Sequence, residues 1–267
     1  MLGFIGGGAM AEALLRGILA KGLVQPDKVW VSDIDANRLS YLKESLGVQT
    51  TASNTEILEK SRIIFLAVKP QVAPVILSEL KGLWEDKHLV VSIMAGVPLS
   101  YLNKYTGPAR LIRVMPNTPC LVQAGAAAIA MGPNAKESDV DEVKALLSAV
   151  AKVVVLDESL LDAVTGLSGS APAYVYIFIE ALADGGVMAG LPRPVAMTLA
   201  AQTVFGAAKM VIETGEHPGS LKDRVTSPAG TTIAGVAALE DGGFRGLVIR
   251  AVVDAAQRSV ELGQEKD

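Results

Sequence analysis

The stretch GFIGGGAMAEALLRG, residues 3–17, places a glycine-rich loop between an apolar run and a segment with helical periodicity. Gly6, Gly8 and Ala11 fit the pattern G-x-G-x-x-A, which is typical of dinucleotide-binding βαβ units. The first glycine permits a tight turn, the second lets the backbone approach a pyrophosphate, and the small third residue allows close helix–strand packing. Unsatisfied N–H groups at the start of the helix favour a negative charge. The stretch therefore predicts that a dinucleotide binds at this helix N-terminus.

A glycine-rich turn at a packed strand–helix corner is the alternative interpretation of so short a motif. A second strand-like run, KVWVSD, follows at the expected distance and ends at Asp33, which favours the dinucleotide. A carboxylate at this position accepts a hydrogen bond from the ribose 2′-OH of NAD, whereas a nearby arginine such as Arg38 accommodates the 2′-phosphate of NADP. Asp33 or Asp35 could also cap the next helix. The sequence is therefore compatible with either NADH or NADPH as the cofactor.

Apolar runs rich in β-branched residues alternate with amphipathic segments over residues 1–115. This alternation predicts βαβ units and a parallel sheet of Rossmann type. A helix over residues 139–150 and the run KVVVLDE then extend or close the sheet. The expected buried strands are Leu2–Ile5, Val29–Val31, Ile63–Val68, Leu89–Ile93 and Leu111–Val114.

The pattern changes after about Ser159, where long segments carry helical spacing and no convincing strand. We therefore expect an α/β dinucleotide-binding domain over residues 1–158 and an all-α domain over residues 159–267. The second domain is rich in alanine and glycine, which allows helices of two chains to interlock at short distance.

Composition narrows the function classes. The chain has 267 residues, a net charge of −4 and no basic cluster, so nucleic acid and anionic membranes are poor partners. The single cysteine, Cys120, excludes an internal disulfide framework and fits a reducing cytoplasm. The N-terminus lacks a leader pattern, and the longest apolar run is too short to span a bilayer. We expect a cytoplasmic enzyme.

Several catalytic arrangements do not occur in the sequence. His88 and His217 stand alone, no His/Cys ligand cluster suggests a metal site, and there is no nucleophile elbow. Reduction of a ketone normally requires a proton donor matched to the alkoxide, and no clear donor is found. A C=N substrate can arrive protonated as an iminium and then needs no enzymatic acid, which favours an imine reductase.

A second motif, VTSPAGTT at residues 225–232, predicts a helix that begins near Gly230 after Pro228. Its first N–H groups lack helical partners. Backbone N–H groups of Ser227, Gly230 and Thr231 could hold a carboxylate, while the Thr232 hydroxyl reaches a neighbouring group. An ordinary Ser/Thr-capped helix start is the alternative interpretation.

The extended segment VTSPAGTTIAGVAALEDGGF closely resembles the signature of pyrroline-5-carboxylate reductases. FIGGGAMAEALLRG, LAVKPQ, VSIMAGV, RVMPNTP and GLSGSAPAYVYIFIEALADGG resemble further segments of that family, in the same order. The resemblance covers essentially the whole chain. Ala9 departs from a common asparagine, and Ala229 and Ala171 from common glycines. The resemblance implies that NADH or NADPH reduces 1-pyrroline-5-carboxylate to L-proline in a homodimer whose helical domains interlock, and that such dimers assemble further into rings.

The same resemblance implies the residues of the site. Backbone amides of Ser227, Gly230 and Thr231 hold the substrate carboxylate, and the hydroxyl of Thr232 is the catalytic contact to the ring nitrogen. Asn117 lies near the nicotinamide, where we expect it to bind the substrate. The implied cofactor contacts are Ile5, Gly6, Gly7, Gly8, Ala9, Met10, Ser32, Asp33, Asn54, Ala67, Val68, Lys69, Pro70 and Ala95.

Two rival functions can be compared with this one. The segment GLSGSAPAY is similar to a substrate-binding motif of β-hydroxyacid dehydrogenases, but that family needs a lysine further along the helix, and none occurs before Lys209. A non-catalytic NAD(P)-binding redox sensor would have no use for a carboxylate pocket, so the second motif argues against it.

Overall fold

The computed structural model describes residues 1–264 and divides into two compact units. The first comprises residues 1–170 and the chain from Val253 onward, and the second comprises residues 171–252. The expected domain boundary after residue 158 stays a prediction.

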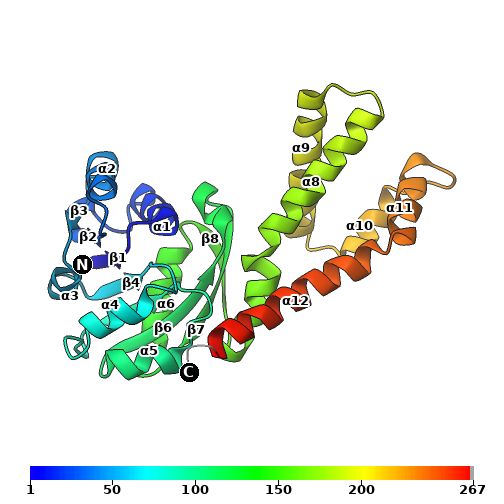
Figure 1. The fold of residues 1–267 in the computed structure, drawn as a ribbon. Helices are drawn as coiled ribbons and strands as arrows, with labels where there is room; N and C mark the ends of the chain where they lie inside the picture. Colours follow the sequence, from blue (N-terminus) through cyan, green and yellow to red (C-terminus); the bar gives the residue numbers. More distant parts are fainter. Residues whose placement is uncertain (265–267) are drawn as a thin grey trace. The chain divides into compact units, whose positions relative to one another are not determined.

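The first unit contains one sheet of eight strands in the order β3-β2-β1-β4-β5-β6-β7-β8 (Figure 1). Neighbouring strands from β3 through to β6 pair in parallel, β7 runs antiparallel to β6, and β8 pairs in parallel with β7. The chain leaves β1 in one direction through β2 and β3, then returns to the other side of β1 as β4. In such sheets ligands bind at the carboxyl ends of the strands where the order reverses. The strands are β1 Leu2–Ile5, β2 Val29–Ser32, β3 Gln49–Thr51, β4 Ile63–Leu66, β5 Leu89–Ser92, β6 Arg110–Pro116, β7 Gly125–Met131 and β8 Ala151–Val155.

The predicted parallel, Rossmann-type sheet is confirmed, and the structure adds two strands that the sequence pattern did not show. β3 has the sequence QTT, which contains no apolar run, and it is only half-buried. β7 has the sequence GAAAIAM, in which alanine replaces the β-branched residues typical of strands. Both positions are fixed by pairing with neighbouring strands rather than by local sequence preference.

Helices cover both faces of the sheet. Helices α1 (Ala9–Ala20), α2 (Ala36–Leu46) and α6 (Glu137–Leu147) share one core cluster. Helices α3 (Asn54–Lys60), α4 (Ala73–Glu79) and α5 (Leu99–Thr106) share the other. Neighbouring strand residues alternate between the two, so Phe4 stacks on Phe65 at 4.8 Å in the first cluster while Ile5 and Ile64 belong to the second. Burial on both faces explains the continuous apolar runs.

Short helical segments complete the first unit. They are η1 (Pro26–Lys28), η2 (Thr118–Val122), η3 (Glu158–Leu160), α7 (Leu161–Val164) and the π-helical turn η4 (Thr165–Gly169). Leu161 of α7 is buried against Ala128 and Ala130 of β7.

Both histidines have structural roles. His88 lies directly before β5 and is 1% exposed; its Nδ1 accepts the Glu85 N–H at 2.9 Å, so its Nε2 donates to the Leu58 carbonyl at 3.0 Å. Burial lowers the pKa of His88 and keeps the ring neutral. His217 precedes α10 and accepts the Gly219 N–H at 3.1 Å. Neither histidine lines the cavity described below.

The second unit consists of helices with a thin core. The hairpin of α8 (Ala171–Met188) and α9 (Arg193–Thr214) packs through Ala183, Ala196 and Ala200. A Cβ on Gly186 would lie 3.1 Å from the Ala196 Cβ, so the helices approach closely because small residues face each other. The unit also contains α10 (Pro218–Arg224), α11 (Thr231–Asp241) and the first part of α12 (Phe244–Gln264).

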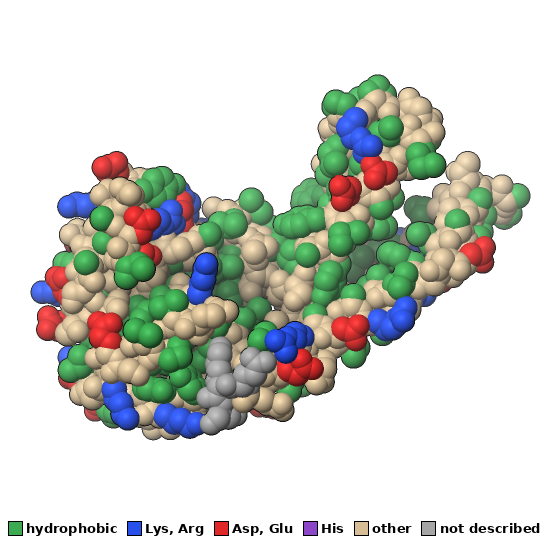
Figure 2. Space-filling model, viewed as in Figure 1, with side chains coloured by type: hydrophobic (Ala, Val, Ile, Leu, Met, Phe, Trp, Pro, Cys, Tyr) green, Lys and Arg blue, Asp and Glu red, His purple; other side chains and the backbone are tan. Residues whose placement is uncertain are grey.

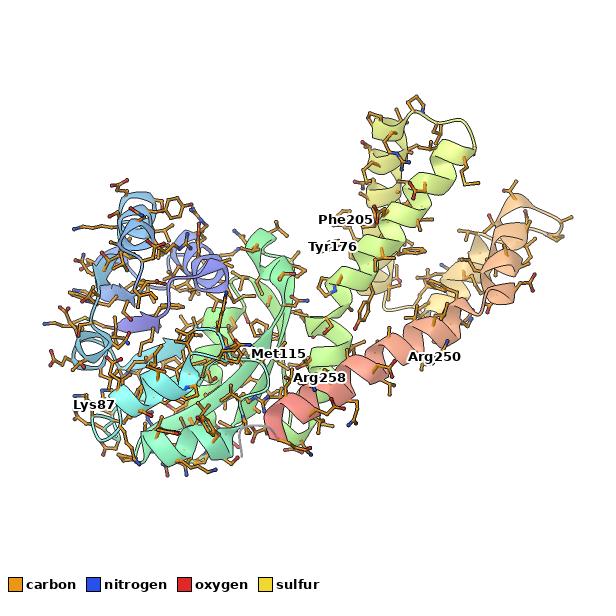
Figure 3. All side chains as sticks on the ribbon, in the orientation of Figure 1. Lys87, Met115, Tyr176, Phe205, Arg250 and Arg258 are labelled. Atoms are coloured by element: carbon orange, nitrogen blue, oxygen red, sulfur yellow. The ribbon has the colours of Figure 1, made fainter. Side chains whose placement is uncertain are left out.

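Large apolar side chains remain exposed on the helices of the second unit (Figure 2). Tyr176 of α8 and Phe205 of α9 are each 60% exposed (Figure 3). The 22-residue helix α9 is by length and composition apolar enough to cross a membrane, and only 11% of its most apolar window is buried within the described chain. So much exposed apolar surface marks an interaction face.

A glycine in α1 permits a close contact that can be tested. A Cβ on Gly17 would lie 2.0 Å from a γ-methyl of Val150 and 3.3 Å from the Ala149 carbonyl. We expect Gly17→Ala to lower the free energy of unfolding by about 1–3 kcal/mol, because overpacking forces a backbone shift. Denaturant unfolding of the full-length protein measures this. The cost should shrink in a Val150→Ala background, which removes the colliding methyl; an equal cost in both backgrounds would contradict the packing explanation.

Candidate functional site

The glycine loop after β1 has one closed side and one open side. Gly6 has φ of 97°, and a Cβ there would lie 2.7 Å from the Ala67 carbonyl oxygen. Gly8 is the N-cap of α1, and a Cβ there would meet nothing within 4 Å. The first glycine is therefore required by the turn against β4, whereas the second borders open space that a ligand can occupy.

The N-terminus of α1 offers free hydrogen-bond donors. Its N-cap makes no side-chain cap bond, and the first backbone bond into the helix runs from Glu12 N–H to Gly8 O at 3.0 Å. Within the described chain, the N–H groups of Ala9, Met10 and Ala11 consequently have no partner. This arrangement of free N–H groups beside open space fits the pyrophosphate of a dinucleotide.

A cavity of about 380 Å³ lies over the carboxyl ends of the strands. Three segments line most of it, namely the start of α1, the loop after β4 and the end of β6, where Met115 lies (Figure 3). The predicted site residues that it brings together are Gly8, Ala9, Met10, Ala67, Val68, Lys69 and Asn117. The cavity is also lined by Ile93, Met115, Pro116, Thr118 and Gly169.

The other predicted cofactor residues surround this cavity without lining it. Ile5 at the end of β1 is buried, and so are Gly6 and Gly7 in the glycine loop itself. Ser32 is buried at the end of β2, and its hydroxyl donates to the Asn54 side-chain oxygen at 2.8 Å. Pro70 follows the β4 loop, and Ala95 is exposed after β5. Their contacts with a cofactor stay predictions.

Asp33 and Asp35 have different tasks. The Asp33 carboxylate accepts the Gly7 N–H at 2.7 Å and the Asp35 N–H at 3.0 Å. Asp35 is the N-cap of α2 and accepts the Asn37 N–H at 2.9 Å. Asp33 is therefore not the helix cap, and its carboxylate lies beside the glycine loop.

Arg38 lies across the same loop. Its Nε donates to the Gly7 carbonyl, and its terminal nitrogen pairs with the Glu12 carboxylate at 2.5 Å. Burial opposes the charge of Glu12, but hydrogen bonds from Arg38, Arg16 and Tyr41 outweigh burial and hold the pKa of Glu12 below its usual value. The ion pair between Glu12 of α1 and Arg38 of α2 thus links the two helices.

Asn117, predicted to bind substrate, has an internal structural task. Its amide nitrogen donates to the Ser168 carbonyl at 3.1 Å, and its amide oxygen accepts the Ala126 N–H at 2.8 Å. These bonds tie η2 to the π-helical turn. Gly169 in that turn lies so close to Met115 that a Cβ would be 2.5 Å from the methionine methyl. π-helical turns occur often at functional sites, but helical spacing in the sequence does not reveal them.

The second motif forms a tight turn before α11. The turn consists of Ser227–Gly230, and the Gly230 N–H donates to the Ser227 carbonyl at 3.0 Å. Pro228 is the second residue of this turn, and Ala229 is the third, with φ of 54°. This is the arrangement of a type II turn, which normally has glycine in the third place. A Cβ on Gly230 would lie 2.2 Å from the Ser227 hydroxyl oxygen, so a larger residue in the fourth place would require the serine side chain to turn away. α11 begins at Thr231 with Gly230 as N-cap, as the sequence predicts.

This helix start also presents unused donors. α11 has no side-chain cap bond and no buried residue. The Gly230 N–H is used in the turn, whereas the N–H groups of Ser227, Thr231 and Thr232 have no partner within residues 1–264. The hydroxyls of these three residues are likewise exposed and unpaired there. The geometry suits an anion, and the Thr232 hydroxyl is free to bond an adjacent atom.

No group of three His, Cys, Asp or Glu side chains in the described part of the chain is arranged to hold a metal ion.

The strained Ala229 gives a testable series. A Cβ at positive φ costs about 1–2 kcal/mol, and a β-branched residue costs more. We expect Ala229→Gly to keep or raise the melting temperature and Ala229→Val to lower it by about 4 °C or more. Thermal unfolding at one protein concentration measures both. A valine variant as stable as the wild type would show that the turn is not held in this conformation.

Comparison with known proteins identifies the family. Residues 158–262 match the family model for pyrroline-5-carboxylate reductase dimerisation, and residues 1–96 match the model for NADP oxidoreductase, coenzyme F420-dependent. The chain is 49% identical to a pyrroline-5-carboxylate reductase of Arabidopsis thaliana, over 98% of this chain and 95% of the relative.

Solved structures give the same result. A pyrroline-5-carboxylate reductase from Coxiella burnetii matches with a TM-score of 0.92 and 35% identity, over 98% of this chain and 97% of that one. A Plasmodium falciparum pyrroline carboxylate reductase with NADP bound matches with a TM-score of 0.88 and 32% identity, over the same shares of the two chains. Because these proteins match 98% of the chain at 32–49% identity, the chain belongs to the pyrroline-5-carboxylate reductase family.

Proposed function

We propose that this protein is an NAD(P)H-dependent pyrroline-5-carboxylate reductase that reduces the C=N bond of 1-pyrroline-5-carboxylate to L-proline, the last step of proline biosynthesis. The observation that carries the proposal is 49% identity over 98% of the chain to a reductase of that name. The uncapped starts of α1 and α11 supply the physical support, because each borders open or exposed space and offers free N–H groups to one anionic ligand.

The cofactor site is assigned to the loop and cavity of the first unit. The N–H groups of Ala9, Met10 and Ala11 would bind the pyrophosphate, and the segment of β6 near Asn117 would lie beside the nicotinamide. When bound, the reduced nicotinamide supplies the hydride. Ile34, 101% exposed next to Asp33, offers an apolar surface at the adenosine end of the crevice. The relative with NADP bound supports this class of cofactor.

The substrate site is assigned to the start of α11. Free N–H groups of Ser227 and Thr231 would bind the substrate carboxylate, assisted by the partial positive charge of the helix N-terminus. Gly230 contributes by keeping the turn tight, because its own N–H is used in the turn. The Thr232 hydroxyl then orients the ring nitrogen. A substrate that arrives as the iminium ion already carries the proton that the product nitrogen retains, so no further acid is needed.

The second unit is assigned to self-association. Its match to a dimerisation domain covers residues 158–262, which include all of α9. A cavity of about 460 Å³ between α8 and α12 is lined by apolar residues, among them Phe178 and Phe244, whose rings lie 5.7 Å apart. We expect a second copy of the chain, rather than lipid or nucleic acid, to cover these faces. Homodimers that assemble into rings, active sites shared between chains and a cytoplasmic location belong to the same proposal.

The rival dehydrogenase class has less support. A β-hydroxyacid dehydrogenase would require a lysine on α8, and Ala171–Met188 contains none. The free N–H groups at α11 likewise have no place in a cofactor-binding sensor.

The reaction itself is the first test. The full-length protein should oxidise NADH or NADPH, followed by the loss of absorbance, when 1-pyrroline-5-carboxylate is added. With 3-hydroxyisobutyrate and the oxidised cofactors it should form no NADH or NADPH, so the absorbance should not rise. Turnover of the hydroxyacid but not of the imine would replace the proposed function with the rival one.

Thr232 provides the second test. Thr232→Val keeps the shape of the side chain and removes the hydroxyl, so kcat/KM should fall by about 10- to 100-fold, the cost of one hydrogen bond to a charged group. Thr232→Ser retains the hydroxyl and should stay within about threefold of the wild type. Steady-state kinetics of both variants measure the difference. Equal kinetics for valine and serine would remove this hydroxyl from the mechanism.

A further inference from the structure

The adenosine end of the cofactor crevice carries one carboxylate whose position is fixed. Asp33 directly follows β2 and accepts N–H groups from Gly7 at 2.7 Å and Asp35 at 3.0 Å. Each carboxylate oxygen has further acceptor capacity after these bonds. A carboxylate at this place accepts from a ribose 2′-OH and repels a 2′-phosphate.

Arg38 is the cation that would be needed to bind a 2′-phosphate, and it is already occupied. Its guanidinium donates to the Gly7 carbonyl and pairs with Glu12 at 2.5 Å, with a longer bond of 3.4 Å to the Gly8 carbonyl. Its guanidinium carbon also lies 5.1 Å above the centre of the Tyr41 ring. All of these contacts hold the side chain against the loop.

Glu12 is the anchor of this arrangement. Its side chain is 16% exposed and also accepts bonds from Arg16 at 2.7 Å and from the Tyr41 hydroxyl at 3.0 Å. If Arg38 turned to a phosphate, the half-buried Glu12 carboxylate would lose its closest partner and keep only the bonds from Arg16 and Tyr41. Arg16 of α1 is held in the same network, since it donates to Glu12 at 2.7 Å and to the Tyr41 hydroxyl at 2.9 Å.

We propose that Glu12 is a specificity-determining residue: by retaining Arg38 it leaves the charge of Asp33 without a neutralising cation, and the protein binds NADH in preference to NADPH. This inference deepens the proposed function only in the choice of cofactor, since it concerns the binding of the dinucleotide and no step of the reaction.

The test is binding of each dinucleotide without substrate. Calorimetric titration of the full-length protein with NADH and with NADPH, at one ionic strength, gives the ratio of the two dissociation constants. We expect the wild type to bind NADH at least about tenfold more tightly. Glu12→Gln should release Arg38 and narrow the ratio by about tenfold, mainly through tighter NADPH binding.

A matched control and a double-mutant cycle separate this explanation from a general change of charge. Glu44→Gln removes one negative charge from the exposed face of α2 and should leave the ratio unchanged. Arg38→Ala should leave the ratio unchanged in the wild-type background, because Arg38 is held, and should abolish the gain in the Glu12→Gln background. Thermal unfolding of each variant confirms that it is folded.

Three results would overturn the proposal: NADPH bound as tightly as NADH by the wild type, equal ratios in Glu12→Gln and Glu44→Gln, or an Arg38→Ala effect of the same size in both backgrounds. Failure to bind either dinucleotide would overturn it together with the cofactor assignment. Because substrate is absent throughout, a failed reductase assay leaves this outcome untouched, and the two ideas can fail separately.

Discussion

The hydrogen bond from the Gly7 N–H to the Asp33 carboxylate joins the first turn of the chain to the end of the second strand. Much of the nucleotide crevice depends on that bond. It holds the glycine loop so that Gly8 faces open space, and it fixes the Asp33 carboxylate directly after β2. It also positions the carbonyl of Gly7 to receive Arg38, and through Arg38 the two helices that border the crevice are connected. One contact therefore sets the shape and the charge of the site together.

The two proposed ligand sites use one physical device. At both α1 and α11 the N-cap is a glycine with extended backbone and no side-chain cap bond. A serine or aspartate at that place would stabilise the helix by roughly a few tenths of a kcal/mol relative to glycine and would also occupy the N–H groups. At these two places an anion can take over the role of the cap. Asp35 and Ser53 cap α2 and α3 with their side chains. Because α4, α5 and α9 also begin without a side-chain cap bond, an uncapped start alone does not mark a ligand site.

Sequence patterns predicted the parts of the fold that are encoded locally. The βαβ alternation, the glycine loop and the start of α11 follow from periodicity and from residues with special backbone roles. β3 and β7 did not, because QTT and GAAAIAM become strands only through partners far along the chain. The task of Asn117 was missed for the same reason, since it bonds Ser168 and Ala126 across the fold. Family resemblance supplied the substrate residues. The ion pair between Glu12 and Arg38 joins residues 26 positions apart and is seen only in the structure.

The thin core of the α8–α9 hairpin makes concentration a variable of folding. Three alanines, with a few partly buried neighbours, bury too little apolar surface to offset the conformational entropy of forty ordered residues (18 in α8 and 22 in α9). When a second chain covers this hairpin, the midpoint of unfolding rises with protein concentration, so dilution destabilises the molecule as heating does.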